Sequence, residues 1–391
     1  MTDSPVYEPL LQPLFNFLPD KMTTGVVVAI TTLLLGSWVM IQQLFGPWVE
    51  RKVMARMQGR RGPTYVGWKG ILQIPADLLK LIFKEDIMPA RADRLGFFIS
   101  IALISITSII SFAPLPWGTN LMGANFGVGV LYVFAVFSLF PPAMFIGGWS
   151  SNSKYALIGG FRSAGQLLAY EIPMFLSGIA IIAVNGTFSL RTITENQMAS
   201  GVGWNLFSHQ LGFLGLITGF IFFIAGVAES ERIPFDIPEA EAELVMGPRT
   251  EFSGWRYALI MMVEYIHLTV NSLLFIYLFF GGYDAIPWVD LAFEHNWAVQ
   301  IIVLTAKLYL FVMIAAWLRS ALPRMRIDQL LSLGWKQLLP IAIIASIGTL
   351  GFVKPSLLGL DAMFKWIISA VTFVLIFLFM FLHFRSTRRR N

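Results

Sequence analysis

The chain has 391 residues, of which 56% are hydrophobic and only 13% are charged, and its formal net charge is +5. Soluble domains carry roughly 25% charged residues, so this composition indicates an all-α polytopic membrane protein in which the basic excess marks cytoplasmic loops and no nucleic-acid partner is expected. The absence of cysteine excludes a thiolate-ligated iron–sulfur cluster, a cysteine zinc site and a disulfide framework within the chain, and we expect no metal site.

Nine apolar stretches are long enough to cross a bilayer, which takes about 20 residues per helix. They lie at 25–46, 94–114, 126–147, 160–186, 210–228, 255–281, 297–318, 337–353 and 362–384. The eighth is short, and Pro141 and Pro142 interrupt the third. No basic region precedes an apolar core at the N-terminus, so we expect the first span itself to direct insertion and no cleavable signal peptide. The sequence therefore predicts about nine transmembrane helices.

The basic residues favour one orientation of these spans. The loop between the first two spans is rich in Lys and Arg, whereas residues 115–125 contain neither. Basic loops face the cytoplasm, so we expect the N-terminus outside and the first loop inside. Nine spans then also place the basic tail, Arg385 to Arg390, inside, while eight would place it outside.

A single membrane domain without internal repeats is expected. Its predicted parts are a non-cytoplasmic extension over 1–24, eight spans within 25–353 with cytoplasmic loops at 47–93 and 229–254, and an additional span with a basic cytoplasmic tail over 354–391.

The first cytoplasmic loop combines charge with an amphipathic pattern. Glu50, Arg51 and Lys52 close the first span, and apolar residues between Trp68 and Ile82 recur at near-helical spacing. This predicts a surface helix beginning after the Gly-Pro pair at 62–63. An acid beside two bases at a helix end fits the charged mouth of a cavity between helices, and a simple positive-inside anchor is the alternative.

Ionisable residues also lie within the spans, where they are costly unless paired or solvated. Glu171 is followed by Pro173 in the fourth span, and Glu264 lies one turn before His267 in the sixth. An acid and an imidazole on one helix face can pass a proton, although a buried polar pair that joins two helices explains Glu264 and His267 equally simply. A structural hydrogen bond between helices is the alternative for Glu171. Lys307 in the seventh span is a possible counter-charge for such acids.

The strongest concentration of acids lies at residues 228–251, which hold seven of the 23 in the chain. Pro234 and Pro238 exclude a regular helix there, so we expect an irregular segment or a short helix. Apolar residues are interleaved with the acids, which favours a loop docked against the spans over a free, solvated loop. These apolar residues are Ile233, Phe235, Ile237, Leu244, Val245 and Met246.

A proton or ion path is the function that this charge pattern predicts. Its expected members form a chain of carboxylates from the cytoplasmic surface toward the bilayer midplane. They are Glu171, Glu229, Glu239, Glu241, Glu243, Glu251 and Glu264.

Six motifs, in order along the chain, resemble the heel subunit of the proton-pumping NADH:quinone oxidoreductase, respiratory complex I, which is the membrane subunit that forms the quinone tunnel. They are ERKVMARMQGRRGP at 50–63, QIPADLLKLIFKED at 73–86, YEIP at 170–173, ESERIPFDIPEAEAELV at 229–245, EFSG at 251–254 and LPRMRIDQLLSLGWK at 322–336.

The resemblance implies a cell-membrane subunit that binds no cofactor of its own. It would take quinone from the bilayer into a tunnel whose mouth lies between the first span, the sixth span and the surface helix, while the chain of carboxylates couples quinone reduction to proton pumping. FMN and iron–sulfur clusters would lie in partner subunits, and the partners would be peripheral-arm quinone-site subunits and small and antiporter-like membrane subunits. The implied tunnel residues are Glu50, Arg51, Arg60, Asp77, Arg232, Phe235 and Asp236.

The chain also departs from the usual motifs of that family. It reads RRGPTYVG after the first span, adds the acid Glu231, and has MGPRTEF where a G-F/Y-x-x-E-Y pattern is usual. Two alternatives stay open. One is the membrane anchor of an energy-converting hydrogenase or formate hydrogenlyase. The other is a cation/proton antiporter, which would be expected to contain inverted repeats.

Overall fold

A computed structural model of the chain describes residues 20–119, 121–124, 126–198, 203–208, 211–238, 241–285, 296–353 and 365–388. These residues are mostly helical, which confirms the all-α class, and the described strands are two short ones that pair as an antiparallel hairpin. From the N-terminus the helices are α2 (Asp20–Met57), α3 (Gln73–Phe83), α4 (Arg94–Ile110), α5 (Gly129–Phe137), α6 (Phe140–Ser150), α7 (Lys154–Asn185), α8 (Leu190–Met198) and α9 (Phe213–Glu229).

The second half contains both long helices and short irregular turns. The helices are α10 (Glu241–Leu244), α11 (Gly254–Phe279), α12 (Trp297–Ala321), α13 (Ile327–Ser332), α14 (Leu339–Val353) and α15 (Lys365–Arg388). The irregular elements are the 3-10 turns η1 (Trp68–Gly70) and η2 (Gly247–Arg249) and the π-helical turn η4 (Leu333–Leu338), while the hairpin strands are β1 (Pro116–Gly118) and β2 (Leu121–Met122).

Several of these elements are apolar enough to lie in a membrane. Five described segments have the length and composition of a span, namely Gly129–Ser150, Lys154–Asn185, Gly254–Phe279, Trp297–Ala321 and Ile327–Val353. Three shorter apolar helices cover Arg94–Ile110, Phe213–Glu229 and Ile367–Met380. Each of these coincides with a predicted span, and α2 contains the first predicted span, so the polytopic membrane fold is confirmed.

Two spans extend well beyond their predicted limits, and the third has the interruption that its prolines predict. Helix α2 extends past its predicted end at residue 46, so Glu50 and Arg51 lie on the helix itself. The third span is broken between α5 and α6, because Pro141 and Pro142 lack the N–H groups that would continue α5 and instead occupy the first turn of α6. The eighth is lengthened at its start by α13 and η4.

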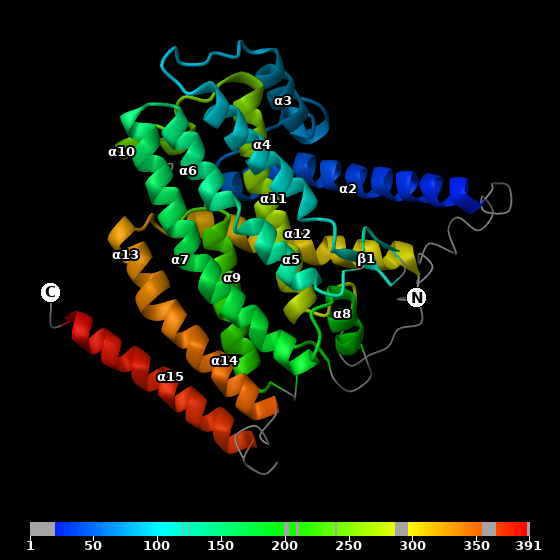
Figure 1. Cartoon of the computed structure of the whole chain (residues 1–391), viewed down its shortest axis with the longest axis vertical. Helices are drawn as coiled ribbons and strands as arrows, with labels where there is room; N and C mark the ends of the chain where they lie inside the picture. Colours follow the sequence, from blue (N-terminus) through cyan, green and yellow to red (C-terminus); the bar gives the residue numbers. More distant parts are fainter. Residues whose placement is uncertain are drawn as a thin grey trace.

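Helix α7 is the centre of the bundle and packs against α6, α9 and α14. Helix α11 joins this group to the other side of the molecule, because it contacts α9, α4, α12 and α3. In Figure 1, α2 and α12 lie across the direction of α7, α9 and α14, and they pack against each other. The additional C-terminal helix α15 runs beside α14 and packs on it.

The surface helix of the first loop begins later than predicted. Gly67, Lys69 and Gly70 have φ angles of 72°, 51° and 78°, so the chain around η1 cannot continue a right-handed helix, and α3 starts only at Gln73. A Cβ on Gly70 would lie 2.2 Å from the Pro63 carbonyl oxygen. Gly70 therefore fixes how the loop folds back before α3.

We expect Gly70→Ala to destabilise this loop more than Gly59→Ala. Both glycines have positive φ, which costs an alanine about 1–2 kcal/mol, but open space surrounds Gly59 and a backbone carbonyl faces Gly70. Trypsin cleavage between Arg56 and Lys69 in the purified protein should accelerate much more for the Gly70 variant. Equal cleavage rates for the two variants would contradict the close approach to Pro63.

Candidate functional site

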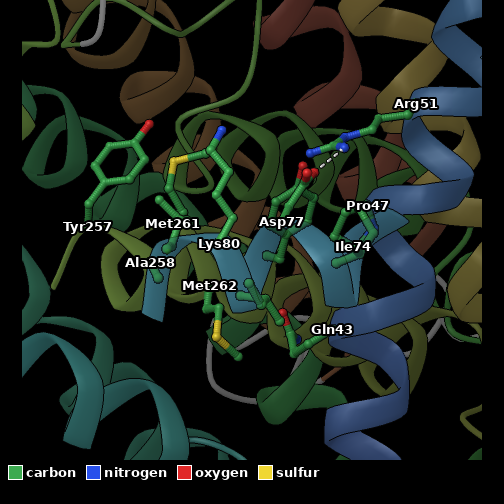
Figure 2. Close-up of a pocket in the computed structure, with 13 residues that line it drawn as sticks. Gln43, Pro47, Arg51, Ile74, Asp77, Lys80, Tyr257, Ala258, Met261 and Met262 are labelled. Carbon is green, nitrogen blue, oxygen red and sulfur yellow. Dashed lines mark hydrogen bonds and ion pairs between the residues drawn. The ribbon is translucent and has the colours of Figure 1, made fainter. Parts of the chain in front are cut away.

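A cavity of about 280 Å³ lies where α2, α3 and α11 meet. Figure 2 shows that its walls come from these three helices, and most of the lining is apolar. An engineered protein cavity of about 150 Å³ holds benzene, so this one has room for a substituted aromatic ring. The apolar lining residues are Pro47, Ile74, Leu78, Leu81, Ala258, Met261 and Met262.

An ion pair forms the polar rim of the cavity. Arg51 Nη1 on α2 lies 2.6 Å from Asp77 Oδ2 on α3, and the two side chains are 41% and 36% exposed. Gln73 Nε2 donates to the other carboxylate oxygen at 3.0 Å. The structure thus brings together two of the residues implied for the tunnel, Arg51 and Asp77, at one edge of the cavity (Figure 2).

One buried polar side chain of the lining, Gln43, lacks a hydrogen-bond partner among the described residues. Gln43 on α2 is 4% exposed, and neither its Oε1 nor its Nε2 makes a hydrogen bond within the described part of the chain. A buried amide without a partner costs roughly 1–3 kcal/mol. Gln43 is therefore a hydrogen-bonding group at the wall that the protein itself does not satisfy.

Glu50, next to Arg51 on α2, faces the interior and is 2% exposed. Arg232 Nη1 donates to both of its carboxylate oxygens, at 3.0 and 3.2 Å, and Arg319 Nη1 of α12 also donates to Oε1. The Arg232 guanidinium lies 4.1 Å from the ring centroid of Tyr265, which lines the cavity. The Glu50 group therefore joins α2, α12 and the acidic segment directly behind the cavity wall.

The acidic segment docks against the bundle, as its apolar residues predict. Phe235 is buried against the ring of Tyr170, and Gln166 Nε2 donates to the carbonyl oxygen of Phe235 at 2.7 Å. Asp236 pairs with Arg324 at 3.2 Å. Ile237 and Leu244 are buried, whereas Val245 and Met246 are exposed.

A second buried group of charges centres on Arg249 of η2. Its Nη2 lies 3.0 Å from Glu231 Oε2, and its Nη1 pairs with Glu264 of α11. Ser163 Oγ on α7 donates to the other oxygen of Glu231 at 2.5 Å. One guanidinium thus holds two carboxylates in the interior.

Glu229 is also buried, but no arginine binds it among the described residues. Neither of its carboxylate oxygens has a hydrogen-bond partner among the described residues, and Glu171 and Glu231 lie near enough to act on it electrostatically. An unpaired carboxylate in an apolar interior is expensive, so this position favours the neutral acid whenever its neighbours are charged. Glu229 is therefore the acid in the described cluster best suited to gain and lose a proton.

The remaining predicted site residues are more peripheral. Glu243 is 63% exposed and accepts a hydrogen bond of 2.6 Å from Arg162, whose guanidinium holds the pKa of that carboxyl below its usual value. Glu251 is half-buried, and Arg60 is exposed and donates to Gln58. Glu239 and the side chain of Glu241 lie outside the described residues.

The structure differs from two pairings that the sequence allows. These are the pair of Glu264 with His267 and the use of Lys307 as a counter-charge for acids in the spans. Glu264 binds Arg249, whereas His267 lies between the rings of Phe137 and Phe140 with Ser108 Oγ 3.4 Å from its Nε2. Lys307 donates to the carbonyls of Phe280, Gly282 and Asp284, at the end of α11 remote from Glu264.

Helix geometry explains both outcomes. A spacing of three residues puts two side chains on one face, but neighbouring elements decide what each one meets. The 16 residues from Glu264 to Phe280 along α11 span about 24 Å, which is too far for Lys307 to pair with Glu264.

Four charged or aromatic residues of the two buried charge groups are not among the predicted tunnel and path residues. They are Glu231, which the sequence marks only as an extra acid, and Arg249, Arg319 and Tyr265. A charge balance over the acidic segment would have pointed to Arg249, since it is the second base among seven acids. Arg319 and Tyr265 become visible only when distant helices are brought together.

A family model described as NADH dehydrogenase matches residues 29–350. The match includes α3, α11, α12 and the acidic segment, and hence every residue of the cavity and of the two charge groups. Helix α15 lies beyond it. Within the described residues no group of His, Cys, Asp and Glu side chains is arranged to hold a metal ion.

Two acid-to-amide substitutions should separate the buried ion pair from the exposed one. Glu50→Gln removes the carboxylate from the buried Arg232 and is expected to cost about 3–5 kcal/mol of stability. Asp77→Asn opens a solvated pair and should cost less than about 1 kcal/mol. The thermal unfolding midpoints of the purified variants measure the difference, and a larger drop for Asp77→Asn would contradict this placement of the charges.

Proposed function

The chain belongs to the NADH dehydrogenase family and is of the type of the heel subunit of respiratory complex I, and on that premise we propose that it forms the mouth of a quinone tunnel and the acidic path that couples quinone reduction to proton pumping. Family membership also means that the chain assembles with other complex I subunits into an oxidoreductase. The tunnel and the coupling are the parts that need support from this chain's own residues.

The cavity supports the tunnel proposal by its chemistry. Its apolar walls suit a quinone ring and the start of its isoprenoid tail, and the amide of Gln43 offers a hydrogen bond to a ring carbonyl. The Arg51–Asp77 pair gives the rim a polar edge at the side of the surface helix. Its position between α2, α3 and α11 agrees with the mouth that the resemblance implies.

The observation that carries the coupling proposal is the contact of one cavity residue with the buried charges. Tyr265 lines the cavity and stacks on Arg232, which binds Glu50. Arg232 follows Glu231 in the chain, and Glu231 leads through Arg249 to Glu264. A change of charge in the cavity would therefore act on the Glu50 group through Tyr265 and Arg232, and on Glu264 through the further contacts of Glu231 and Arg249.

The chemistry of quinones requires such a cluster. A quinone that accepts two electrons becomes strongly basic and takes up two protons, so acids nearby must supply protons or shift their own charge. The electrons would come from FMN and iron–sulfur clusters in partner subunits. In this chain Glu229 would exchange a proton, while Glu50, Glu231 and Glu264 would be held ionised by the arginines that bind them.

The composition of the purified complex separates this proposal from its nearest alternative. Flavin and NADH-binding chains, peripheral-arm quinone-site subunits and small and antiporter-like membrane subunits are the partners we propose. Co-purification of a nickel–iron hydrogenase would instead identify the anchor of an energy-converting hydrogenase.

Filling the cavity should slow the reduction of quinone. Ala258 on α11 lines the cavity, so Ala258→Phe is expected to raise the KM for a long-tailed quinone about tenfold, a loss of about 1.4 kcal/mol of binding. Quinone reductase activity of the assembled complex in membranes measures this change. Ala306→Phe is the matched control, because Ala306 on α12 is exposed on the surface of the chain. Equal KM values for the two variants would contradict a ligand path through the cavity.

Removing the proton site at Glu229 should uncouple pumping from electron transfer. Glu229→Gln keeps the shape of a side chain that has no hydrogen-bond partner to lose, so the fold should tolerate it. The number of protons pumped per electron in sealed vesicles is expected to fall several-fold, because glutamine cannot bind and release a proton. Glu195→Gln on α8, where the acid pairs with Arg191, should leave that ratio unchanged. A normal ratio in the Glu229 variant would remove this acid from the path.

A further inference from the structure

Arg249 is among the largest fully buried side chains of the described residues, with 1% of its surface exposed. A guanidinium is stable in such a place only when carboxylates neutralise it and accept its hydrogen bonds. Glu231 and Glu264 both do so. The same guanidinium contacts the cavity wall, since Nη1 lies 3.7 Å from Sδ of Met261.

The backbone around Arg249 is built for a close approach to α7. Gly247, which begins η2, has a φ of 56°, and a Cβ on Gly159 of α7 would lie 2.6 Å from the backbone of Gly247. Ser163 is one turn farther along the same helix and holds Glu231. Helix α7 therefore positions both η2, which carries Arg249, and the first carboxylate that Arg249 binds.

The ion pair joins two parts of the acidic segment that lie apart in the chain. Glu231 comes just before Pro234, and Arg249 lies in η2, after α10. They are 18 positions apart in the chain and meet at 3.0 Å. The positive charge of Arg249 cancels the negative charge of Glu231, so the pair does not change the net charge of the acidic cluster.

We propose that Arg249 is a positioning residue of the acidic path that binds Glu231, and that it links the cavity wall at Met261 to the carboxylate of Glu264. The proposal rests on the proposed function. Arg249 holds Glu231 and Glu264 in the charged form, which leaves the exchange of protons to Glu229. A negative charge that develops in the cavity attracts the guanidinium and weakens its hold on both acids.

A charge-removal cycle on the assembled complex tests this proposal. The variants are Arg249→Met, Glu231→Gln and the two together, with quinone reductase activity and protons pumped per electron as the two measurements in vesicles. Arg249→Met leaves two buried carboxylates without their cation, so the proton ratio should fall roughly tenfold, whereas the double variant removes one of those charges and should recover most of the ratio. A double variant that pumps no better than Arg249→Met would overturn the proposal.

The cycle distinguishes a positioning role from a merely structural one. A structural role predicts that all variants lose reductase activity and pumping in the same proportion, and that result would also overturn the proposal. Where Arg249→Met lowers the amount of assembled complex, Arg249→Lys takes its place. Lysine keeps the charge but lacks the planar fork that binds two carboxylates at once, so its proton ratio should fall by a smaller factor, and an unchanged ratio would count against the proposal.

The outcome is separable from that of the proposed function. If Glu229→Gln lowers the proton ratio but the double variant shows no recovery over Arg249→Met, only the role of Arg249 fails. If Glu229→Gln and Glu264→Gln both leave the ratio normal, the acidic path itself fails, and the role of Arg249 fails with it.

Discussion

Two guanidinium groups, those of Arg232 and Arg319, converge on the buried carboxylate of Glu50. A single charge in this apolar bundle would cost several kcal/mol, and removing one partner of such a group exposes that cost, so the three side chains constrain one another. Because they come from α2, the acidic segment and α12, this group fixes α2 against the rest of the bundle. The cavity depends on that constraint, since α2 forms one of its three walls.

Among the described residues, the buried acids of this cluster divide into those that an arginine binds and Glu229, which no arginine binds. Glu50, Glu231 and Glu264 each have an arginine, and a charge held in this way is fixed because leaving it unpaired is too costly. Glu229 has no donor among the described residues. Proton coupling requires an acid that can change its protonation state among charges that stay fixed. Glu229 is such an acid, because no arginine holds it ionised when the electric field of its neighbours changes.

The sequence predicts those features of the fold that depend on local pattern. Apolar length locates the spans, and the apolar residues within the acidic segment predict that it docks. The start of α3 was misplaced because its limit is set by a close contact of Gly70 with Pro63, which hydrophobic spacing does not reveal. The partners of Glu50 and Lys307 could not be predicted, since they lie on other elements and depend on how the helices cross.

The geometry of the acids bears on how coupling would travel. A continuous hydrogen-bonded chain would require Glu229 to bond its neighbours, and its oxygens make no such bond in the described part of the chain. Glu171 and Glu231 instead act on it through their charge. In an electrostatic relay of this kind no proton has to move along the whole path. A change of charge at the cavity alters the free energy of ionising the neighbouring group, and that change in turn acts on the group after it. The arginines are then essential parts of the relay, since they determine which acids keep a fixed charge and which one titrates.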